Sequence, residues 1–429
     1  MSERLDAAAA AAESTRGQNA YWVLLALVAG LGLGALTAML GDGLREPALK
    51  VSNMVGGLWL DALKMTVIPL IVALLVTGVA RGAEAARAGR IAGRSVLWIV
   101  IICTASAIFG TLMIQLLTSA FPLPPAAAQA LQAGLTGIDQ QAASTTVPGI
   151  MDFFSGIVPS NVVAAASNGD VLPLVVFSLL FALAAARIAS DRRASLVGFF
   201  EAVGDALLVV IGWVLRIAPL GVFALAYTVG ASAGAAAFAG VIHYIVLISA
   251  IGVLVTLAAY PVAMLAGGIG IGRFTRGMIA PQSVAISTRS SLASLPAMLA
   301  AARNLGIREQ VADVTLPMSV ALFRATGPAM NVAVAFYVAH WLGFQPSITQ
   351  VIAATAVAAV ISYGAVSLPG EVSFISSIAP IAMALGVPIG PLALLVAVEM
   401  VPDIFRTLGN VTMDVAVTAA VDRQTAPES

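Results

Sequence analysis

The length of its uncharged apolar runs constrains this chain most. Residues 95–138 contain no Asp, Glu, Lys or Arg, and neither do residues 217–272. The chain is 60% hydrophobic and 10% charged, whereas soluble domains carry about 25% charged residues. A helix of about 20 apolar residues is long enough to cross a bilayer. The sequence therefore predicts an all-α integral membrane protein that crosses the bilayer many times.

Six uninterrupted apolar segments before residue 270 are predicted to be transmembrane helices. They cover residues 20–41, 54–80, 92–120, 170–190, 197–230 and 240–266. Two further long helices are predicted at 311–340 and 388–424, which makes eight. Residues 1–19 are polar and Ala-rich and lack the apolar core of a signal peptide, so we expect a cytoplasmic tail there.

Basic residues predict the orientation of these helices. The connections after the second, fourth and sixth segments are rich in arginine, whereas residues 121–169 contain no Lys or Arg. Basic loops stay in the cytoplasm. We therefore expect residues 121–169 to face outward and both termini to lie in the cytoplasm.

Two later apolar segments are interrupted by the same three residues. Ser294-Leu295-Pro296 interrupts one and Ser367-Leu368-Pro369 interrupts the other. A proline removes a backbone donor and clashes with the preceding turn, so it tends to break a helix. Each half is too short to cross the bilayer. We predict two re-entrant helical hairpins whose tips line a cavity, because exposed backbone is tolerated there at that depth.

The two hairpins are each followed by a helix that carries a Phe-Arg pair, Phe323-Arg324 and Phe405-Arg406. A hairpin plus a helix thus occurs twice. If the hairpins enter from opposite faces, the chain holds an inverted repeat with a substrate site near the bilayer midplane. Chance similarity in an Ala-, Leu- and Ser-rich chain is the alternative.

The last predicted helix carries a polar face. Its members recur at offsets of one, three or four residues, and therefore share one side of a helix; they are Asp403, Arg406, Thr407, Asn410 and Asp414. A mid-membrane arginine costs about 3 kcal/mol to insert, so it needs a carboxylate nearby. A ligand could supply that carboxylate, or Asp403 could form a structural pair with Arg406.

These motifs resemble the dicarboxylate/amino acid:cation symporter family, which includes the glutamate transporters. The similar stretches are "LKMTVIPLIVALLVTGVA" (63–80), "TRSSLASLP" (288–296), "VSLPG" (366–370) and "DIFRTLGNVTMD" (403–414). The resemblance covers about residues 20–424. It implies eight transmembrane helices plus two hairpins, an elevator mechanism and a homotrimer in the cell membrane, in bacteria the inner membrane.

The resemblance also divides the chain into two parts. Residues 20–80 and 121–235 would form a static scaffold. Residues 81–120 and 236–424 would form the moving transport part.

The resemblance implies a role for each polar residue. Arg406 would bind a substrate carboxylate and Asp403 a substrate ammonium group, which fits an acidic amino acid or a small dicarboxylate. The remaining implied substrate contacts are Thr407, Asn410, Ser290 and Ser291, with Pro369 and Gly370 in a gate at the second tip. The alternative is a kinked, packed helix whose hydroxyl groups bond to their own backbone.

One stretch departs from the family pattern. Where sodium-coupled members carry Asn-Met-Asp-Gly-Thr, this chain has Phe323-Arg324-Ala325-Thr326-Gly327. A fixed guanidinium repels a cation, so we predict that Arg324 replaces a bound sodium ion. Its expected partner is Asp414, beside Asn410, or Glu371. Coupling to protons, or exchange, is then favoured over sodium coupling. Glu371 is a candidate proton carrier, because burial favours the protonated carboxyl group; a wetted tip residue is the alternative.

Other functions find little support. The net charge is zero, which argues against a nucleic-acid partner. The single cysteine, Cys103, permits no metal cluster of cysteines. No histidine lies near either tip to activate a serine, so we expect no enzyme, and no cofactor beyond H⁺ or Na⁺ as a coupling ion. A sodium-independent facilitator or exchanger, or an anion channel of the same fold, remains open.

Overall fold

The computed structural model describes residues 22–39, 42–87, 89–125, 128, 158–233, 236–363 and 370–426. Within these ranges only the backbone is described at 42–44, 86–87, 233, 236–237 and 370–373. Every regular element in this part of the chain is a helix, which confirms the all-α prediction.

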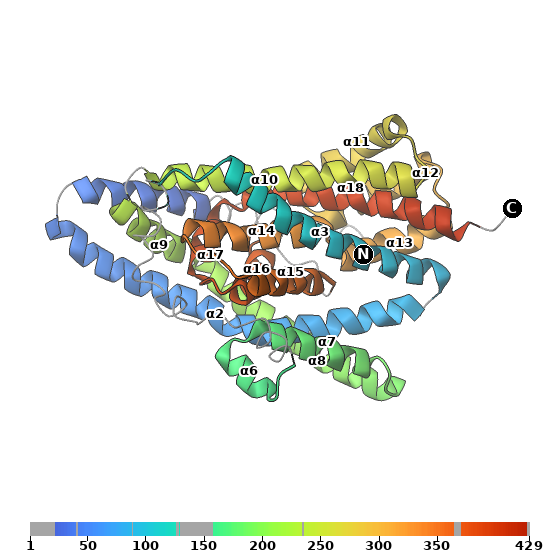
Figure 1. Cartoon of the computed structure of the whole chain (residues 1–429), viewed down its shortest axis with the longest axis horizontal. Helices are drawn as coiled ribbons and strands as arrows, with labels where there is room; N and C mark the ends of the chain where they lie inside the picture. Colours follow the sequence, from blue (N-terminus) through green and yellow to red (C-terminus); the bar gives the residue numbers. More distant parts are fainter. Residues whose placement is uncertain are drawn as a thin grey trace, which may run out of the picture.

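The helices follow one another along the chain (Figure 1). After a first helix, Trp22–Met39, they are α2 (Asp42–Arg87), α3 (Arg90–Ala120), α6 (Val162–Asn168), α7 (Val171–Ala185), α8 (Ser190–Arg216), α9 (Ala218–Ala233), α10 (Ala236–Pro261) with the π-helix η2 (Val262–Ala266), α11 (Ile271–Thr288), α12 (Ser291–Asn304), α13 (Glu309–Leu322), α14 (Thr326–Trp341), α15 (Ile348–Tyr363), α16 (Gly370–Leu385), α17 (Gly390–Leu395), the 3₁₀ turn η3 (Val396–Val398) and α18 (Met400–Thr425).

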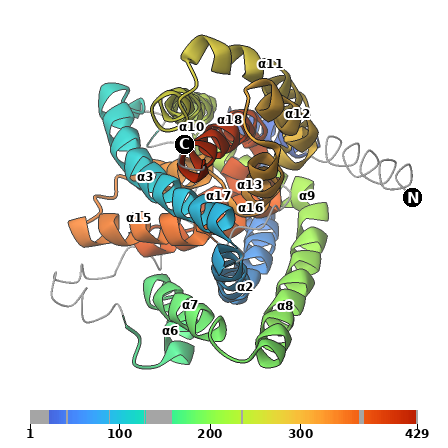
Figure 2. The same cartoon turned by 90° about the vertical axis from the view of Figure 1, so that its right-hand side faces the viewer.

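The long helices run along the longest axis of the molecule and pack as two groups (Figures 1 and 2). The first group is α2 with α7, α8 and α9. In the second group α18 packs against α10, α3 and α11–α14. Both α14 and the C-terminal half of α18 are buried almost completely, and so form the centre of the second group.

The helices are apolar enough for a membrane. Among the described residues five helices of at least 18 residues have the length and composition to cross a bilayer. Large apolar side chains face outward, for example Leu58 at 66% and Phe199 at 61% exposure. In a soluble protein such a surface would be a liability, so the fold is that of a multi-pass membrane protein.

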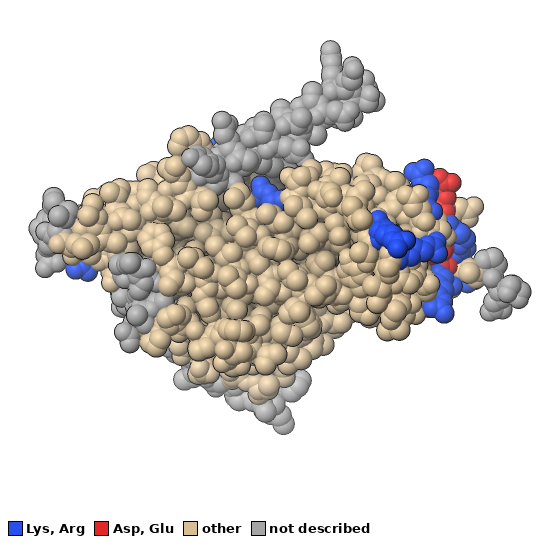
Figure 3. Space-filling view, turned by 90° about the horizontal axis from the view of Figure 1, so that it is seen from above, with Lys and Arg blue, Asp and Glu red and all other residues tan. Residues whose placement is uncertain are grey.

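Charged residues gather at the end of the molecule where α18 ends (Figure 3). Arg81, near the C-terminal end of α2, lies 2.7 Å from Glu201 of α8. Arg308 donates to Asp422 at 2.6 Å at the same end of α18. The arginine-rich connections that we expect in the cytoplasm thus meet at one end of the molecule, and their orientation in a membrane stays a prediction.

Two packed helices, α11 and α12, stand where the first hairpin is predicted; the predicted position of the break is wrong, and the re-entry of this hairpin into the bilayer stays a prediction. α11 ends at Thr288 and α12 begins at Ser291, so the chain turns at Arg289 and Ser290. Pro296 lies inside α12 rather than at the tip. The turn is built by Arg289 in the left-handed region (φ 51°) and by the Ser290 hydroxyl, which accepts from the Ala293 N–H and so caps α12.

The single helix predicted at 311–340 is also wrong, because it is two helices. Phe323 is extended (φ −108°, ψ 129°) and ends α13, and α14 starts at Thr326. The Ser106 hydroxyl of α3 donates to the Ala325 carbonyl in this break. Arg324 therefore lies between two helix ends, where backbone groups are free of helical partners.

Three other predicted boundaries change. α2 extends through the expected outer loop at 42–53, and the segment 197–230 divides at Ile217 into α8 and α9. The helix predicted at 388–424 is divided by η3. The second hairpin pairs α15 with α16; its predicted tip, Ser367-Leu368-Pro369, lies outside the described residues.

Candidate functional site

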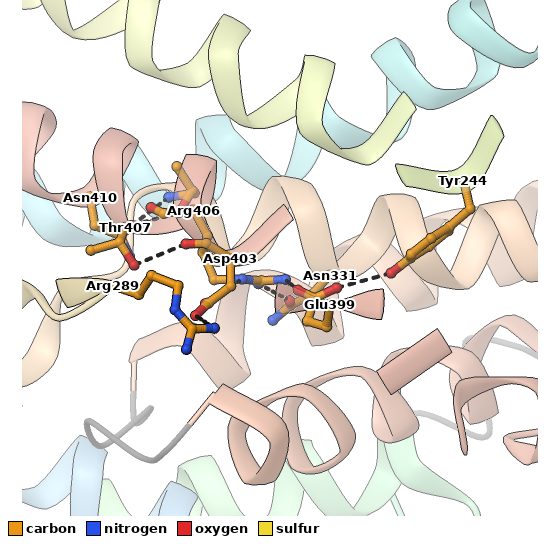
Figure 4. Close-up of polar contacts among 9 residues, drawn as sticks. Tyr244, Arg289, Asn331, Glu399, Asp403, Arg406, Thr407 and Asn410 are labelled. Atoms are coloured by element: carbon orange, nitrogen blue, oxygen red, sulfur yellow. Dashed lines mark hydrogen bonds and ion pairs between the residues drawn. The ribbon is translucent and has the colours of Figure 1, made fainter. Parts of the chain in front are cut away.

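The predicted polar face of α18 exists and is largely buried. Asn410 is 2% exposed and Asp414 is fully buried. The side chains of Asp403 and Arg406 are 16% and 15% exposed. These residues lie where α18 meets α10, α14 and the first hairpin (Figure 4).

Arg406 is held by oxygen atoms of the protein. Its Nη2 donates to Oε1 of Glu399, and its Nη1 donates to Oδ1 of Asn331 at 2.6 Å. Its Nε lies 3.8 Å from Oδ1 of Asp403. The carboxylate that Arg406 needs is thus supplied here by Glu399 more closely than by Asp403. Any carboxylate from outside the chain that binds Arg406 has to share or displace this contact.

Sequence reasoning missed three residues of this cluster. Glu399 directly precedes α18 and donors reach both of its carboxylate oxygens, Arg406 on Oε1 and the Tyr244 hydroxyl on Oε2 at 3.1 Å. Its spacing of seven residues from Arg406, two helical turns, is a signal that could have found it. Asn331 and Tyr244 come from α14 and α10, and no local pattern marks them.

The first hairpin reaches the site through Arg289. Its Nη1 lies 4.0 Å from Oδ2 of Asp403, so Asp403 stands between two guanidinium groups (Figure 4). The predicted contacts Ser290 and Ser291 lie at the start of α12. Ser290 caps Ala293, and its carbonyl accepts from the Ser294 hydroxyl at 2.9 Å. The hydroxyl of Ser290 therefore has a local role, and its binding to substrate stays a prediction.

Asn410 joins α18 to the start of α14. Its Oδ1 accepts from the Thr326 backbone N–H at 2.9 Å and lies 2.7 Å from the Thr326 hydroxyl. The same hydroxyl lies 2.8 Å from the Arg406 carbonyl. Thr407 bonds back to the Asp403 carbonyl at 3.0 Å. Both predicted substrate contacts, Thr407 and Asn410, thus have partners inside the protein.

Arg324 and Asp414 form a buried pair of opposite charges without direct contact. Neither carboxylate oxygen of Asp414 accepts a hydrogen bond within the described residues, and Nη2 of Arg324 has no acceptor there. The positive charge of Arg324 acts on Asp414 through the protein interior. A buried carboxylate without a hydrogen bond is energetically unfavourable. The charge of Asp414 is therefore balanced by the charge of Arg324 at a longer distance.

The predicted second-tip residues lie outside what is described. Pro369 is not described, and Gly370 and Glu371 are described only as backbone at the start of α16. Their predicted roles as a gate and as a proton carrier therefore stay predictions.

The sequence is similar to known membrane transporters over most of its length. Residues 20–424 match the sodium:dicarboxylate symporter family, which confirms the resemblance seen in the motifs. The chain is 27% identical to a proton/glutamate-aspartate symporter of Escherichia coli K12, over 91% of this chain and 89% of that protein. It is 27% identical to a proton/sodium-glutamate symport protein of Bacillus subtilis 168, over 89% and 88%, and 25% identical to a C4-dicarboxylate transport protein of Laribacter hongkongensis HLHK9, over 94% and 88%.

Proposed function

Because the chain belongs to the sodium:dicarboxylate symporter family, we propose that it moves acidic amino acids or small dicarboxylates across the cytoplasmic membrane as a cation-coupled symporter. The coupling ion is a proton, and sodium binding is partly lost. The transport part moves past the scaffold as an elevator, in a homotrimer.

The observation that carries this proposal is the partly exposed guanidinium of Arg406 on the buried polar face of α18. Arg406 is 15% exposed, beside the hairpin tip that Arg289 occupies. A guanidinium binds a carboxylate with two parallel hydrogen bonds, and ionisable residues at membrane depth are rare unless they function. Arg406 binds one substrate carboxylate. Asp403, whose contacts to both arginines are long, accepts a substrate ammonium group.

The position of Arg324 supports the loss of sodium. It stands between α13 and α14, and its charge acts on Asp414. A tethered cation at this place opposes a second cation by about 4 kcal/mol at 4 Å in a medium of dielectric 20. Asp414 is therefore balanced by Arg324 rather than by a bound ion.

The packing supports an elevator. The helices α2, α7, α8 and α9 pack on one another, while α10–α14 and α18 surround the site. A group of helices that carries the whole site is able to move as one body against the rest.

Uptake into proteoliposomes tests the function. Purified protein is reconstituted, and uptake of labelled glutamate, aspartate and succinate is measured with sodium and proton gradients imposed separately. We expect uptake driven by an inward proton gradient and indifferent to sodium. A steep sodium requirement contradicts the role of Arg324. Equilibration that neither gradient changes identifies a facilitator or exchanger, and substrate-independent anion current identifies a channel.

A thermal-shift screen narrows the substrate. Glutamate and aspartate carry the ammonium group that Asp403 is proposed to bind, whereas succinate and malate do not. Stabilisation by the amino acids alone supports that role of Asp403. Equal stabilisation by succinate shows that Asp403 serves only as a partner of Arg406 and Arg289.

A further inference from the structure

Glu399 is a buried carboxylate in direct contact with the guanidinium that is proposed to bind substrate. It is 3% exposed and lies at the junction of η3 and α18. Arg406 donates to Oε1, and the Tyr244 hydroxyl, itself fully buried, donates to Oε2 at 3.1 Å (Figure 4). None of the substrate or sodium roles derived above uses this carboxylate.

Counted over the side chains that the structure describes, the site is formally neutral without substrate. Three guanidinium groups act at or near it, those of Arg289, Arg324 and Arg406, and they face three carboxylates, Glu399, Asp403 and Asp414. An acidic amino acid or a dicarboxylate adds one or two negative charges to this set. Its carboxylate also competes with Glu399 for the same guanidinium.

Losing Arg406 would leave Glu399 as a buried anion with a neutral phenol as its other partner. Removing one partner of a buried ion pair is strongly destabilising, because the remaining charge is uncompensated. A proton on the carboxylate removes that cost, and it restores the neutrality of the site when the substrate adds one negative charge. The exchange of partners at Arg406 is thus linked to proton binding at Glu399.

We propose that Glu399 is the proton-binding group of this transporter: it is ionised while it holds Arg406, and takes a proton from the aqueous phase when a substrate carboxylate takes Arg406. This inference rests on the proposed function. Tyr244 is a positioning residue, which holds Oε2 and stabilises the ionised form through its hydrogen bond.

Among the described carboxylates, Glu399 makes the closest contact with Arg406. On its own helix it faces Arg406 and Asp403. α10 contributes Tyr244, and α14 contributes Asn331 and Tyr337. The Tyr337 ring packs edge-on against the Tyr244 ring, with the ring centroids 5.3 Å apart. Neighbouring α9 and α17 contain no Asp, Glu, Lys or Arg, and α16 contains only Glu371, whose side chain is not described.

Two further polar side chains, Tyr337 and His243, lie between this cluster and the end of the molecule that the sequence predicts to face outward. The Tyr337 hydroxyl lies 3.1 Å from Nδ1 of His243, whose Nε2 lies 2.8 Å from the Phe121 carbonyl after α3. His243 is partly exposed. These polar groups end at Tyr337, because the two tyrosine hydroxyls share no hydrogen bond in the described structure.

Calorimetric titration of the full chain in detergent tests the assignment. Glutamate and succinate are titrated in two buffers of different ionisation enthalpy, which yields both the affinity and the number of protons taken up per substrate bound. We expect the wild type to take up protons, and Glu399→Gln to bind with proton uptake reduced to background. The exposed-acid control Glu309→Gln should retain the wild-type value, and Glu371→Gln tests the rival proton site at the second hairpin.

A second variant covers the case in which Glu399→Gln does not fold. Tyr244→Phe keeps the buried ring and removes only the donor to the ionised carboxylate. The acid limb of the pH profile of proton uptake should therefore move to higher pH. A purely structural role of Tyr244 would lower thermal stability and leave this profile unchanged.

The outcomes separate the two proposals. If the wild type binds neither glutamate nor succinate, the proposed function fails and the inference with it. If the wild type binds substrate but takes up no proton, or if Glu399→Gln retains the wild-type proton number, the inference alone is overturned. Loss of proton uptake in Glu371→Gln with retention in Glu399→Gln would move the proton site to the second hairpin.

Discussion

Thr326 directs both its backbone N–H and its hydroxyl to a single oxygen, Oδ1 of Asn410, at 2.9 and 2.7 Å. The first residue of α14 is thereby tied to the middle of α18 in the buried centre of the molecule. Asn410→Ala would leave the Thr326 N–H buried and unsatisfied. We expect the free energy of unfolding without substrate to fall by about 1–3 kcal/mol, measured by denaturation in detergent.

Asn304→Ala is the matched control for this prediction, because Asn304 is exposed at the end of α12. It should change stability by less than about 0.5 kcal/mol. Equal effects of the two variants would show that the Asn410 contact does not stabilise the fold.

Gly409 allows α18 to approach α14. A Cβ at this position would lie 2.3 Å from Cγ2 of Thr326 and 3.0 Å from Oγ1 of Thr256. Gly409→Ala should therefore cost about 1–3 kcal/mol through overpacking. Adding Thr326→Ser, which removes Cγ2 and keeps the hydroxyl, should recover part of the loss. Thermal unfolding of the two variants measures both effects.

The control is Gly212→Ala in α8, where an added Cβ meets nothing within 4 Å. This change should be neutral or stabilising by about 0.5–1 kcal/mol, since alanine is the better helix former. Failure of Thr326→Ser to improve Gly409→Ala would place the steric conflict elsewhere.

Arg324 and Asp414 should show strong energetic coupling. Arg324→Met alone leaves an uncompensated buried carboxylate and should cost about 3–5 kcal/mol. The double variant with Asp414→Asn should be more stable than Arg324→Met, because both charges are then absent. A double-mutant cycle based on unfolding in detergent measures the coupling.

Sodium gives a second measure of this pair. If Arg324 stands in place of a cation, sodium should raise the unfolding temperature of Arg324→Met and leave that of the wild type unchanged, with potassium as the salt control. The same sodium response in both proteins contradicts the replacement.

Arg406 should not tolerate lysine. Its Nη1, Nη2 and Nε address three different side chains, and a single ammonium group cannot reproduce that planar geometry. Arg406→Lys should weaken glutamate or succinate binding by about 2–5 kcal/mol, measured by calorimetric titration. Arg81→Lys is the control, since Arg81 is half exposed in its pair with Glu201; a surface pair contributes about 1 kcal/mol or less. Equal substrate affinity in both variants would remove Arg406 from the binding site.

The sequence predicts an all-helical, apolar chain correctly, because long apolar segments are local signals. It misplaces the hairpin tip, since Pro296 suggests a break where the helix in fact continues, while Ser290 provides the cap that starts α12. The break before α14 has no local signal in Phe323-Arg324-Ala325. Contacts from other helices hold it, namely Ser106 from α3 and Asn410 from α18.

The site is predictable only along α18. Helical spacing within one segment predicts that Asp403, Arg406 and Asn410 lie on one face. Tyr244 and Asn331 belong to the same cluster through tertiary packing of α10 and α14, which no spacing in the sequence encodes. The resemblance assigned the carboxylate partner of Arg406 to a substrate, whereas the structure brings in Glu399 as a partner from the chain itself.

At Arg289, the residue that supplies the positive charge of the first tip has an unfavourable left-handed backbone conformation. It is the single non-glycine residue with positive φ among the described residues, and this conformation costs an L-residue about 1–2 kcal/mol. Glycine would relieve that strain, yet it would also remove the cation that faces Asp403 from the hairpin. Glycine at position 289 would give an unstrained turn, and arginine gives the positive charge that faces Asp403, but no residue gives both. This chain has the charge and a strained turn.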